Sequence, residues 1–185
     1  MFPIVIKEDV VIKPVTGLNI EKLKGHIPNV VIAQIPETAK KFNITTNLRL
    51  AHFLSQCAHE SGNFKFVVEL ASGKAYEGRK DLGNVNPGDG VKFKGRGLIQ
   101  CTGRTNYKKF SDFIGEDCVA NPDLVATKYP LASAAFFFDS NKLWSICDKG
   151  ADDATVTAVT KRVNGGTIGL ADRIKHFKEY YNLLK

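Results

Sequence analysis

HESGNFKFVVELASGKAYEGRKDLGNVNPGDGVKFKGRGLIQCTGRTNY, residues 59–107, is the stretch that decides how this sequence is interpreted. Glu60 lies at the end of an apolar helical segment, and two more carboxylates, Glu69 and Glu77, follow within one loop. The glycine-flanked segment GRGLIQ then brings amide and hydroxyl side chains. Glycosidic bond cleavage requires two carboxyl groups across a polar cleft, one protonated to donate to the leaving oxygen and one ionised. This stretch therefore contains the residue types that such a site requires.

The sequence before this stretch predicts helices. Residues 19–42 contain two helical segments separated by prolines, and Asn47 can cap a further helix. That helix ends near Glu60, because the Gly62-Asn63 pair is a stop signal. Its apolar residues share one predicted face: Leu50, Phe53, Leu54, Cys57 and Ala58.

The sequence after Glu60 predicts a loop and then a return to helix. Residues 71–97 contain seven glycines, which favours a binding loop or short hairpin over a helix. We expect a mainly α class, with a loop-rich or small β insertion around residues 65–97. Residues 1–15 read as an arm or strand, and residues 16–185 as one domain. Later helices are expected at 107–114, 130–144, 153–163 and 171–184, with Phe136, Phe137, Phe138 and Trp144 in the core.

The cysteines and histidines do not predict a metal site or a cofactor. The histidines do not cluster, and the cysteines follow no metal-ligand spacing, so buried reduced thiols are the expected state. GRGLIQ also lacks the third glycine of a nucleotide-binding turn. The cysteines in question are Cys57, Cys101, Cys118 and Cys147.

Four motifs in this order, AHESGNF, YEGRKDLGN, PGDG and GRGLIQCTGRTNY, resemble the lysozyme-like branch of glycoside hydrolase family 19. This family holds plant-type chitinases and many bacteriophage endolysins. The resemblance extends from Leu48 to the C-terminus, where RVNGG and the last helix are also similar. It implies a lysozyme-like fold and hydrolysis with inversion at the anomeric carbon. The segment between Glu69 and Gly95 is shorter than in many relatives, which favours a compact, open cleft.

The resemblance also implies catalytic roles. Glu60 matches the general acid, and Glu69, nine residues on, matches the general base of the phage-type members. Glu77 corresponds better to the longer separation of the chitinase-type members. If Glu69 is the base, Glu77 holds the loop or binds substrate, paired with Arg79. Thr102 matches a hydroxyl residue that positions the water, although a threonine bonded to backbone is the alternative.

The remaining matches concern substrate binding. Gln100 and Asn106 match amides that bind the N-acetyl groups and hydroxyls of the sugar, since an amide both donates and accepts. Tyr76 could stack on a sugar face or pack on the domain. Asn164 and Arg173 match late positions that line the cleft, although Asn164 also suits a helix end.

The leading functional hypothesis is a monomeric, cofactor-free endolysin that cuts the β-1,4 bond between N-acetylmuramic acid and N-acetylglucosamine in peptidoglycan. A chitinase acting on poly-N-acetylglucosamine is the nearest alternative. A lytic transglycosylase, with one essential glutamate and an anhydro product, is another. A non-catalytic wall-binding module of the same fold is the alternative from a different class.

Charge and the N-terminal sequence fit the wall hypothesis. The net charge of +7 comes from scattered residues, without the basic stripe typical of nucleic-acid binding. Attraction to an anionic bacterial wall explains it better, beside the alternative of a merely soluble basic surface. MFPIVIKEDVVIKP lacks the features of a secretory signal, and no apolar run is long enough for a transmembrane helix. We therefore expect synthesis in the host cytoplasm and release to the wall by a phage holin.

Overall fold

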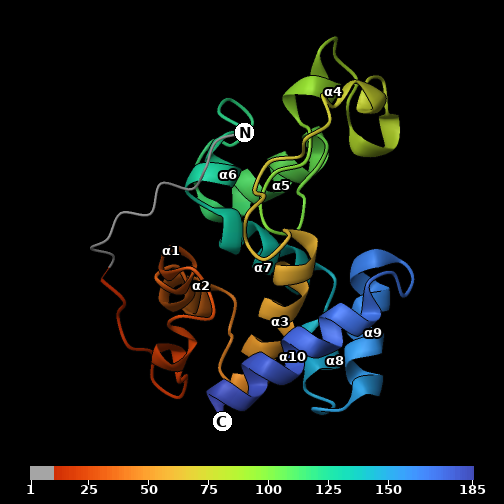
Figure 1. Ribbon diagram of the computed structural model, residues 1–185. Coiled ribbons are helices and arrows are strands. Elements are labelled where there is room, and N and C mark those ends of the chain that lie inside the picture. The colour runs from red at the N-terminus through yellow and green to blue at the C-terminus, as the bar shows by residue number, and fades with distance from the viewer. Residues whose placement is uncertain (1–10) are drawn as a thin grey trace.

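The computed structural model describes residues 11–185, and Figure 1 shows that they form two lobes. The helical lobe contains α1 to α3 and α7 to α10, and the C-terminus lies there. The loop lobe, residues 65–114, projects from it and has α4 near its far end. The expected arm or strand falls mostly on residues 1–10, outside the described residues. Among residues 11–185, no helix is long and apolar enough to span a membrane.

The chain is mainly helical, as predicted, and its described part has no strand longer than an isolated bridge. The region predicted as two helices contains three short ones, because Pro28 and the turn at residues 33–34 interrupt it, whereas Pro36 lies in the first turn of the last of them. The elements are η1 Ile20–Leu23, α1 Asn29–Ile32, α2 Ile35–Lys41, α3 Asn47–Glu60, η2 Lys74–Tyr76, η3 Lys80–Leu82, α4 Asp89–Lys92, α5 Arg104–Ile114, α6 Leu124–Thr127, α7 Pro130–Ser140, α8 Trp144–Cys147, α9 Asp153–Asn164 and α10 Leu170–Leu184.

Helix α3 is the centre of the helical lobe. Its predicted end at Glu60 is confirmed, but the predicted Asn47 cap is wrong, because the Thr46 hydroxyl accepts from Arg49 N. Asn47 instead accepts from the backbone of Asn19, which ties the start of α3 to the N-terminal segment. The predicted apolar face is buried in the core, and the rest of the range 50–58 is buried as well. Neighbouring helices surround α3, and α10 makes the most extensive of these contacts.

The helices after the loop differ from the prediction at some of their ends, in the division of one helix into two, and in the additional short helix α6. α5 begins three residues before the predicted position 107, at Arg104, because Gly103 has a φ of +90° and marks the turn before it. The predicted helix 130–144 is two helices, since α7 stops at Ser140 and Trp144 starts α8. The predicted helices 153–163 and 171–184 are confirmed to within one residue at each end.

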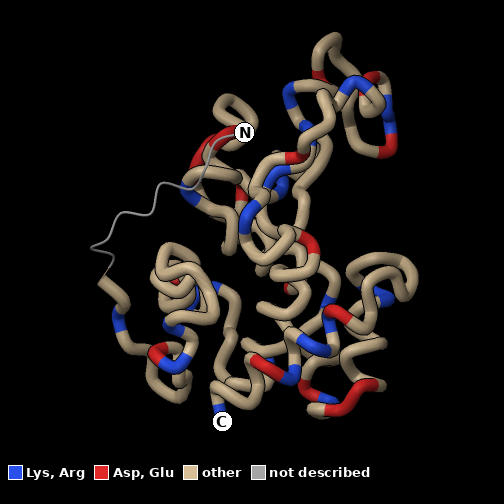
Figure 2. Tube along the Cα trace, in the orientation of Figure 1, with Lys and Arg blue, Asp and Glu red and all other residues tan. Residues whose placement is uncertain are grey.

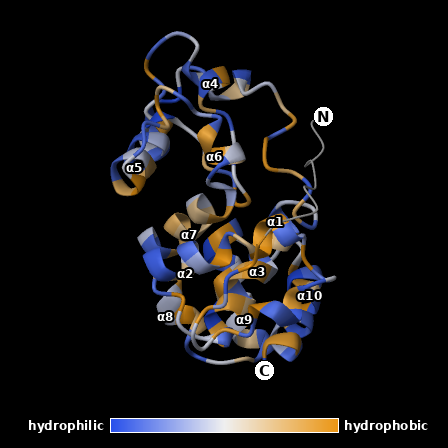
Figure 3. Cartoon of the chain, turned by 90° about the vertical axis from the view of Figure 1, so that its left-hand side faces the viewer, coloured by the Kyte–Doolittle hydropathy of each residue, from blue (hydrophilic) through white to orange (hydrophobic). Residues whose placement is uncertain are grey.

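Most of the core lies in the helical lobe, where apolar residues concentrate between the helices (Figure 3). It extends into the loop lobe through Phe93, Leu98, Ile99, Tyr107 and Phe110. Phe138 and Trp144 are buried as predicted, whereas Phe136 and Phe137 are only partly buried against the core. All four cysteines are free thiols, as expected. Burial raises the pKa of Cys101 and of Cys147 to about 12, so neither is a reactive thiolate at neutral pH.

The loop lobe has almost no apolar interior between Ala71 and Lys92. Its backbone is held instead by hydrogen bonds and by ion pairs. Arg96 forms isolated antiparallel bridges with Val68 and with Cys101, which is the whole of the predicted β insertion. The arginine side chain is buried and pairs with Asp123, which gives it a structural role. Hydrogen bonds and ion pairs therefore hold the far part of this lobe, and apolar packing begins only at its base.

Candidate active site

The turn after α3 explains the HESGNF sequence. Three consecutive residues, Gly62, Asn63 and Phe64, have φ values of +57°, +60° and +63°. Left-handed backbone is easy for glycine and tolerated by asparagine, but it is strained for a buried phenylalanine. The buried Ser61 hydroxyl stabilises the turn by donating to Cys57 O at 2.6 Å and accepting from Phe64 N at 2.9 Å. The turn stops α3 at Glu60 and redirects the chain toward the loop lobe.

Glu60 is accessible but held by a buried arginine. Its side chain is 24% exposed, and Oε1 accepts a hydrogen bond of 2.6 Å from Arg173 Nη2. The Arg173 side chain is 1% exposed and also donates to Gln56 Oε1 and Ile168 O. Arg173 was predicted to line the cleft. The structure instead buries its guanidinium, and Nε, Nη1 and Nη2 each donate to a protein acceptor.

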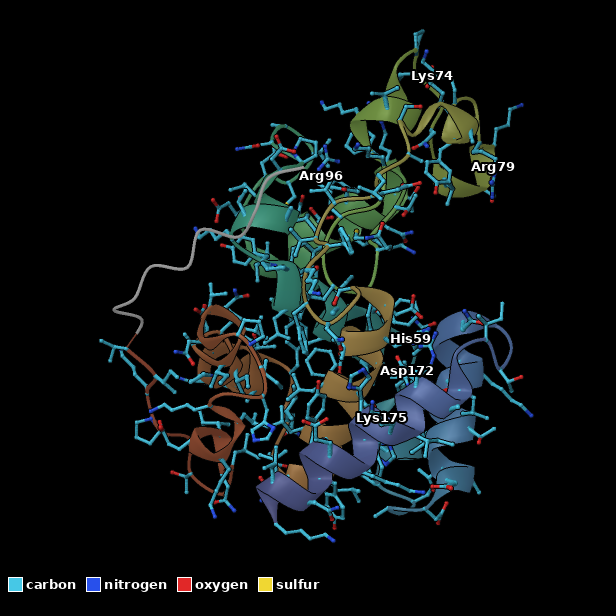
Figure 4. The ribbon with its side chains drawn as sticks, viewed as in Figure 1. His59, Lys74, Arg79, Arg96, Asp172 and Lys175 are labelled. Carbon is cyan, nitrogen blue, oxygen red and sulfur yellow. The ribbon has the colours of Figure 1, made fainter. Side chains whose placement is uncertain are left out.

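A second charged cluster lies at the same end of α3. His59 Nδ1 lies 2.7 Å from Asp172 Oδ2, and both side chains are labelled in Figure 4. His176, one turn further along α10, lies 3.5 Å from the same carboxylate. The hydrogen bond from His59, together with the nearby charges, holds the pKa of Asp172 below its usual range against the opposing effect of burial. Residues 59 and 60 are thus each tied to α10, through residues 172 and 173.

Glu69 lies at the base of the loop lobe, and its carboxylate accepts hydrogen bonds from two neutral donors. Tyr76 Oη donates to Oε1 at 2.9 Å, and the Gly95 amide donates to Oε2 at 2.9 Å. Burial, and then the bond to Glu69, raises the pKa of the Tyr76 phenol, so it remains a donor at neutral pH. Tyr76 was predicted to stack on a sugar or to pack on the domain. The structure assigns it a further contact, which orients the Glu69 carboxylate.

Glu77 holds the loop, which was the predicted alternative to a catalytic role. Its Oε1 accepts from Gly88 N at 2.6 Å and its Oε2 from Gly90 N at 2.8 Å. The expected pairing with Arg79 is wrong, because Arg79 pairs with Asp81 instead. Both carboxyl oxygens of Glu77 are occupied by the backbone of the loop that they close.

Gln100 lies beside Glu69. A β-carbon placed on Gly95 would lie 2.0 Å from Gln100 Oε1 and 3.1 Å from Glu69 Oε2. The two side chains therefore cover the same face of Gly95, and only glycine leaves room for both. This contact explains sterically why the GRG segment, residues 95–97, begins with glycine, apart from the conformational freedom of that residue.

Of the other polar residues predicted to act in the site, two lie near Gln100 and one does not. The Thr102 hydroxyl donates to Gln100 O at 3.3 Å, which is the backbone-bonded alternative to a role with water. Asn106 is exposed on α5 and donates to Thr102 O at 2.8 Å. Asn164 is the exposed last residue of α9, followed by Gly165 at φ +79°. Thr102 and Asn106 are thus brought together with Gln100, whereas Asn164 belongs to the helical lobe.

Two supporting contacts were missed from the sequence. Gln56 lies one turn before Glu60 on α3, and the i, i+4 spacing placed both on one side of the helix. Asp89, within the PGDG motif, makes two hydrogen bonds to Arg104, at 2.8 Å and 2.5 Å. The Asp89 side chain is only 2% exposed, and the bonds from Arg104 are the main reason its pKa is lowered. No sequence spacing pointed to this pair, which joins the loop to α5.

Comparison with known families places these residues in context. A family model described as "Chitinase class I" matches residues 37–145, which include Glu60, Glu69 and Glu77. A glycosyl hydrolase family 19 domain-containing protein of Haemophilus influenzae is 29% identical over 196 residues, covering 89% of this chain and 94% of that protein. An endochitinase of Arabidopsis thaliana is 30% identical over 142 residues, covering 73% of this chain. The chain spans about half the length of that endochitinase, 47%.

Solved structures show the same fold at lower identity. The class IV chitinase of family GH19 from Zea mays is similar with a TM-score of 0.64 at 19% identity, over 91% of this chain and 86% of that one. Chitinase C from Streptomyces griseus is similar with a TM-score of 0.58 at 22% identity, over 80% of this chain and 61% of that one. The mainly α fold predicted from the sequence is thereby confirmed.

Proposed function

The chain belongs to glycoside hydrolase family 19, the family of the class I chitinases, and is a glycosidase; from this premise we propose that it hydrolyses peptidoglycan with Glu60 as general acid and Glu69 as general base. The observation that carries the proposal is the contrast between these two carboxyl groups. Glu60 ends α3 of the helical lobe and Glu69 belongs to the loop lobe, and their hydrogen-bonding partners differ in kind.

Glu60 is suited to donate a proton from a fixed position. Arg173 holds Oε1, and Oε2 makes no hydrogen bond to any residue in the range 11–185. In the proposed reaction this free oxygen carries the proton that passes to the leaving glycosidic oxygen as the bond from that oxygen to carbon breaks. A fixed orientation lowers the entropic cost of reaching the transition state.

Glu69 is suited to accept a proton from water. Tyr76 and Gly95 both donate to it, so its oxygens act as acceptors, as those of an ionised carboxylate do. In the proposed reaction the water oxygen attacks the anomeric carbon while Glu69 takes its proton. Inversion requires the two carboxyl groups to lie roughly 6.5–9.5 Å apart, with room for that water. Gln100, beside Glu69, would bind the N-acetyl group or a hydroxyl of the sugar.

The proposed substrate is the glycan strand of the bacterial wall, cut between N-acetylmuramic acid and N-acetylglucosamine. The net charge of +7 supports an anionic polymer as the partner. In this proposal the enzyme works as a monomer without a cofactor. It is made in the host cytoplasm and reaches the wall through a phage holin.

A second candidate substrate is chitin. Relatives named endochitinases and chitinases favour it, among them the proteins of Arabidopsis thaliana and Zea mays. Chitin presents the same N-acetyl groups and the same type of β-1,4 bond, so Glu60 and Glu69 would perform the same chemistry on it.

The decisive experiment compares the two polymers directly. Release of reducing ends is measured from purified peptidoglycan and from N-acetylglucosamine oligomers at equal concentrations of cleavable bonds. We expect faster release from peptidoglycan, with products that mass spectrometry identifies as hydrated muropeptides. Exclusive cleavage of the oligomers would make the protein a chitinase. Anhydro products would instead indicate a lytic transglycosylase.

A further inference from the structure

The positive charge of this protein is concentrated in the loop lobe. Residues 65–114 contain ten basic and five acidic residues, a net charge of +5. The other 135 residues contribute only +2 of the total of +7. Figure 2 shows that basic and acidic residues are otherwise intermixed along the helical lobe. The lobe that contains Glu69 therefore carries most of the excess charge.

Half of these basic residues have a structural role. Three arginines make ion pairs, Arg79 with Asp81, Arg96 with Asp123 and Arg104 with Asp89. Lys108 pairs with Asp112, and Lys94 donates to two backbone carbonyls. Five exposed lysines remain that pair with no acidic residue in the described part of the chain: Lys65, Lys74, Lys80, Lys92 and Lys109.

Three of these lysines belong to the loop that supports Glu69. Lys74 opens η2, the short helix whose last residue, Tyr76, donates to the Glu69 carboxylate. Lys92 ends α4, which packs against η2 so closely that a β-carbon on Gly73 would lie 2.5 Å from Gly90 O. Lys80 opens η3 in the same loop. We call Lys74, Lys80 and Lys92 the loop lysines; Figure 4 labels Lys74 near the far end of the lobe.

The loop that carries these lysines is fixed. The Asp89–Arg104 pair and the Glu77 carboxylate close it from two sides. Asn84 is fully buried and donates to Tyr76 O at 2.9 Å, which joins the loop to η2. Unpaired charges on a fixed loop, whose Tyr76 donates to the Glu69 carboxylate, favour one sign of ligand and repel the other.

We propose that the loop lysines bind the carboxylates of the stem peptides attached to the glycan strand, and so select peptidoglycan over chitin. This inference rests on the proposed function. Chitin is uncharged, so these lysines gain nothing from it. Peptidoglycan differs by short peptides on alternate sugars, whose carboxylates outnumber their amines. A strand bound beside Glu69 brings those carboxylates next to the loop lobe.

The test replaces all three loop lysines with glutamine. The matched control carries Lys22→Gln, Lys40→Gln and Lys149→Gln, three exposed lysines of the other part of the molecule that have no ion pair within residues 11–185. Binding is measured in a Glu60→Gln background by co-sedimentation with peptidoglycan stripped of teichoic acid. KM is measured in the active background on the same peptidoglycan and on N-acetylglucosamine oligomers.

We expect the loop-lysine variant to bind peptidoglycan about fivefold more weakly at 0.01 M salt, where the screening length is roughly 30 Å. The difference should fall below about twofold at 1 M salt, where that length is roughly 3 Å. KM for the neutral oligomers should not change, and the control should match wild type on both polymers.

Equal weakening in the control, or a loss that does not depend on salt, would overturn the role of the loop lysines. The role would also be overturned if the loop lysines affected binding only when teichoic acid is present, because they would then bind its phosphates. These results are separate from the proposed function, because the binding assay needs no catalysis. If binding weakens as expected but the protein cleaves only chitin oligomers, the role of the loop lysines is supported and peptidoglycan is rejected as the substrate.

Discussion

The helical lobe and the loop lobe hold their candidate catalytic carboxyl groups by different physical means. Glu60 ends a helix that is buried on all sides, and a buried guanidinium fixes it. Glu69 belongs to the loop lobe, where a tyrosine hydroxyl and a backbone amide fix it beside a segment, residues 71–92, that has no buried apolar side chain. An apolar core thus positions one carboxyl group and a polar network the other. The contacts around Glu69 should open locally at a lower cost in free energy, because few packed apolar side chains surround them.

The largest effect is expected for Glu60→Gln. Glutamine keeps an oxygen for Arg173 but has no proton of suitable acidity to donate, so kcat should fall about 10³-fold. Hydrolysis of peptidoglycan and the circular dichroism spectrum measure activity and fold together. Glu37→Gln, an exposed change on α2, is the matched control and should leave kcat unchanged. Undiminished lysis by the Glu60 variant would reject the glycosidase mechanism and favour a wall-binding module.

Arg173→Met tests whether the helical lobe depends on its buried charge. Glu60 and Gln56 would both lose their partner, and breaking a buried pair costs about 3 kcal/mol of the free energy of unfolding. Urea unfolding measures the loss. Arg162→Met, on the exposed side of α9, should cost less than about 0.5 kcal/mol. Equal stability of the two variants would show that Arg173 does not hold this end of α3.

The pair Glu69→Gln and Glu77→Gln distinguishes base from loop support. The first should lower kcat about 10²-fold, because in the proposed reaction this carboxylate removes a proton from water. It should change stability little, because the Tyr76 hydroxyl can accept from the new amide while Gly95 N donates to its oxygen. The second should lower stability by about 1–2 kcal/mol, since a glutamine amide cannot accept from both Gly88 and Gly90. Activity assays and urea unfolding of both variants separate these outcomes. The reverse pattern would make Glu77 the base.

Asp89→Asn should loosen the loop lobe alone. It weakens two hydrogen bonds to Arg104 and should cost about 2 kcal/mol of local stability. Limited proteolysis and hydrogen exchange should show faster opening of residues 71–95, with the helical lobe as protected as in wild type. Equal loss of protection in α3 and α10 would mean that the two lobes unfold as one unit.

Lowering the pH should weaken the Asp89–Arg104 pair and lower the melting temperature by a smaller amount. The bonds from Arg104 hold the pKa of Asp89 below its usual range, so this carboxylate stabilises the fold above that range. The contribution is present at neutral pH and is lost as pH falls below about 4, through the lowered folded-state pKa. The melting temperature of wild type should therefore drop more between pH 6 and pH 3 than that of Asp89→Asn. Equal drops would exclude a role for Asp89 in acid sensitivity.

Much of the helical lobe was predictable because helix signals are local. The apolar run before Glu60 and the Gly62-Asn63 stop predicted α3 to the residue at its end. Where local rules failed, a distant contact had intervened. Thr46 took the cap that Asn47 could have formed, because Asn47 is used by Asn19, 28 positions away.

The sequence by itself determined the mainly helical class, the reduced thiols and the position of the turn after α3, because these depend on composition and on neighbours along the chain. The sequence also identified Glu60 and Glu69 as candidate catalytic residues and Gln100 as a candidate substrate-binding residue. Only the tertiary structure decided that Arg173 pairs with Glu60, that Glu77 closes its loop and that Asp89 meets Arg104. Contacts between distant residues depend on how the packed helices bring them together, and no spacing along the chain encodes that distance.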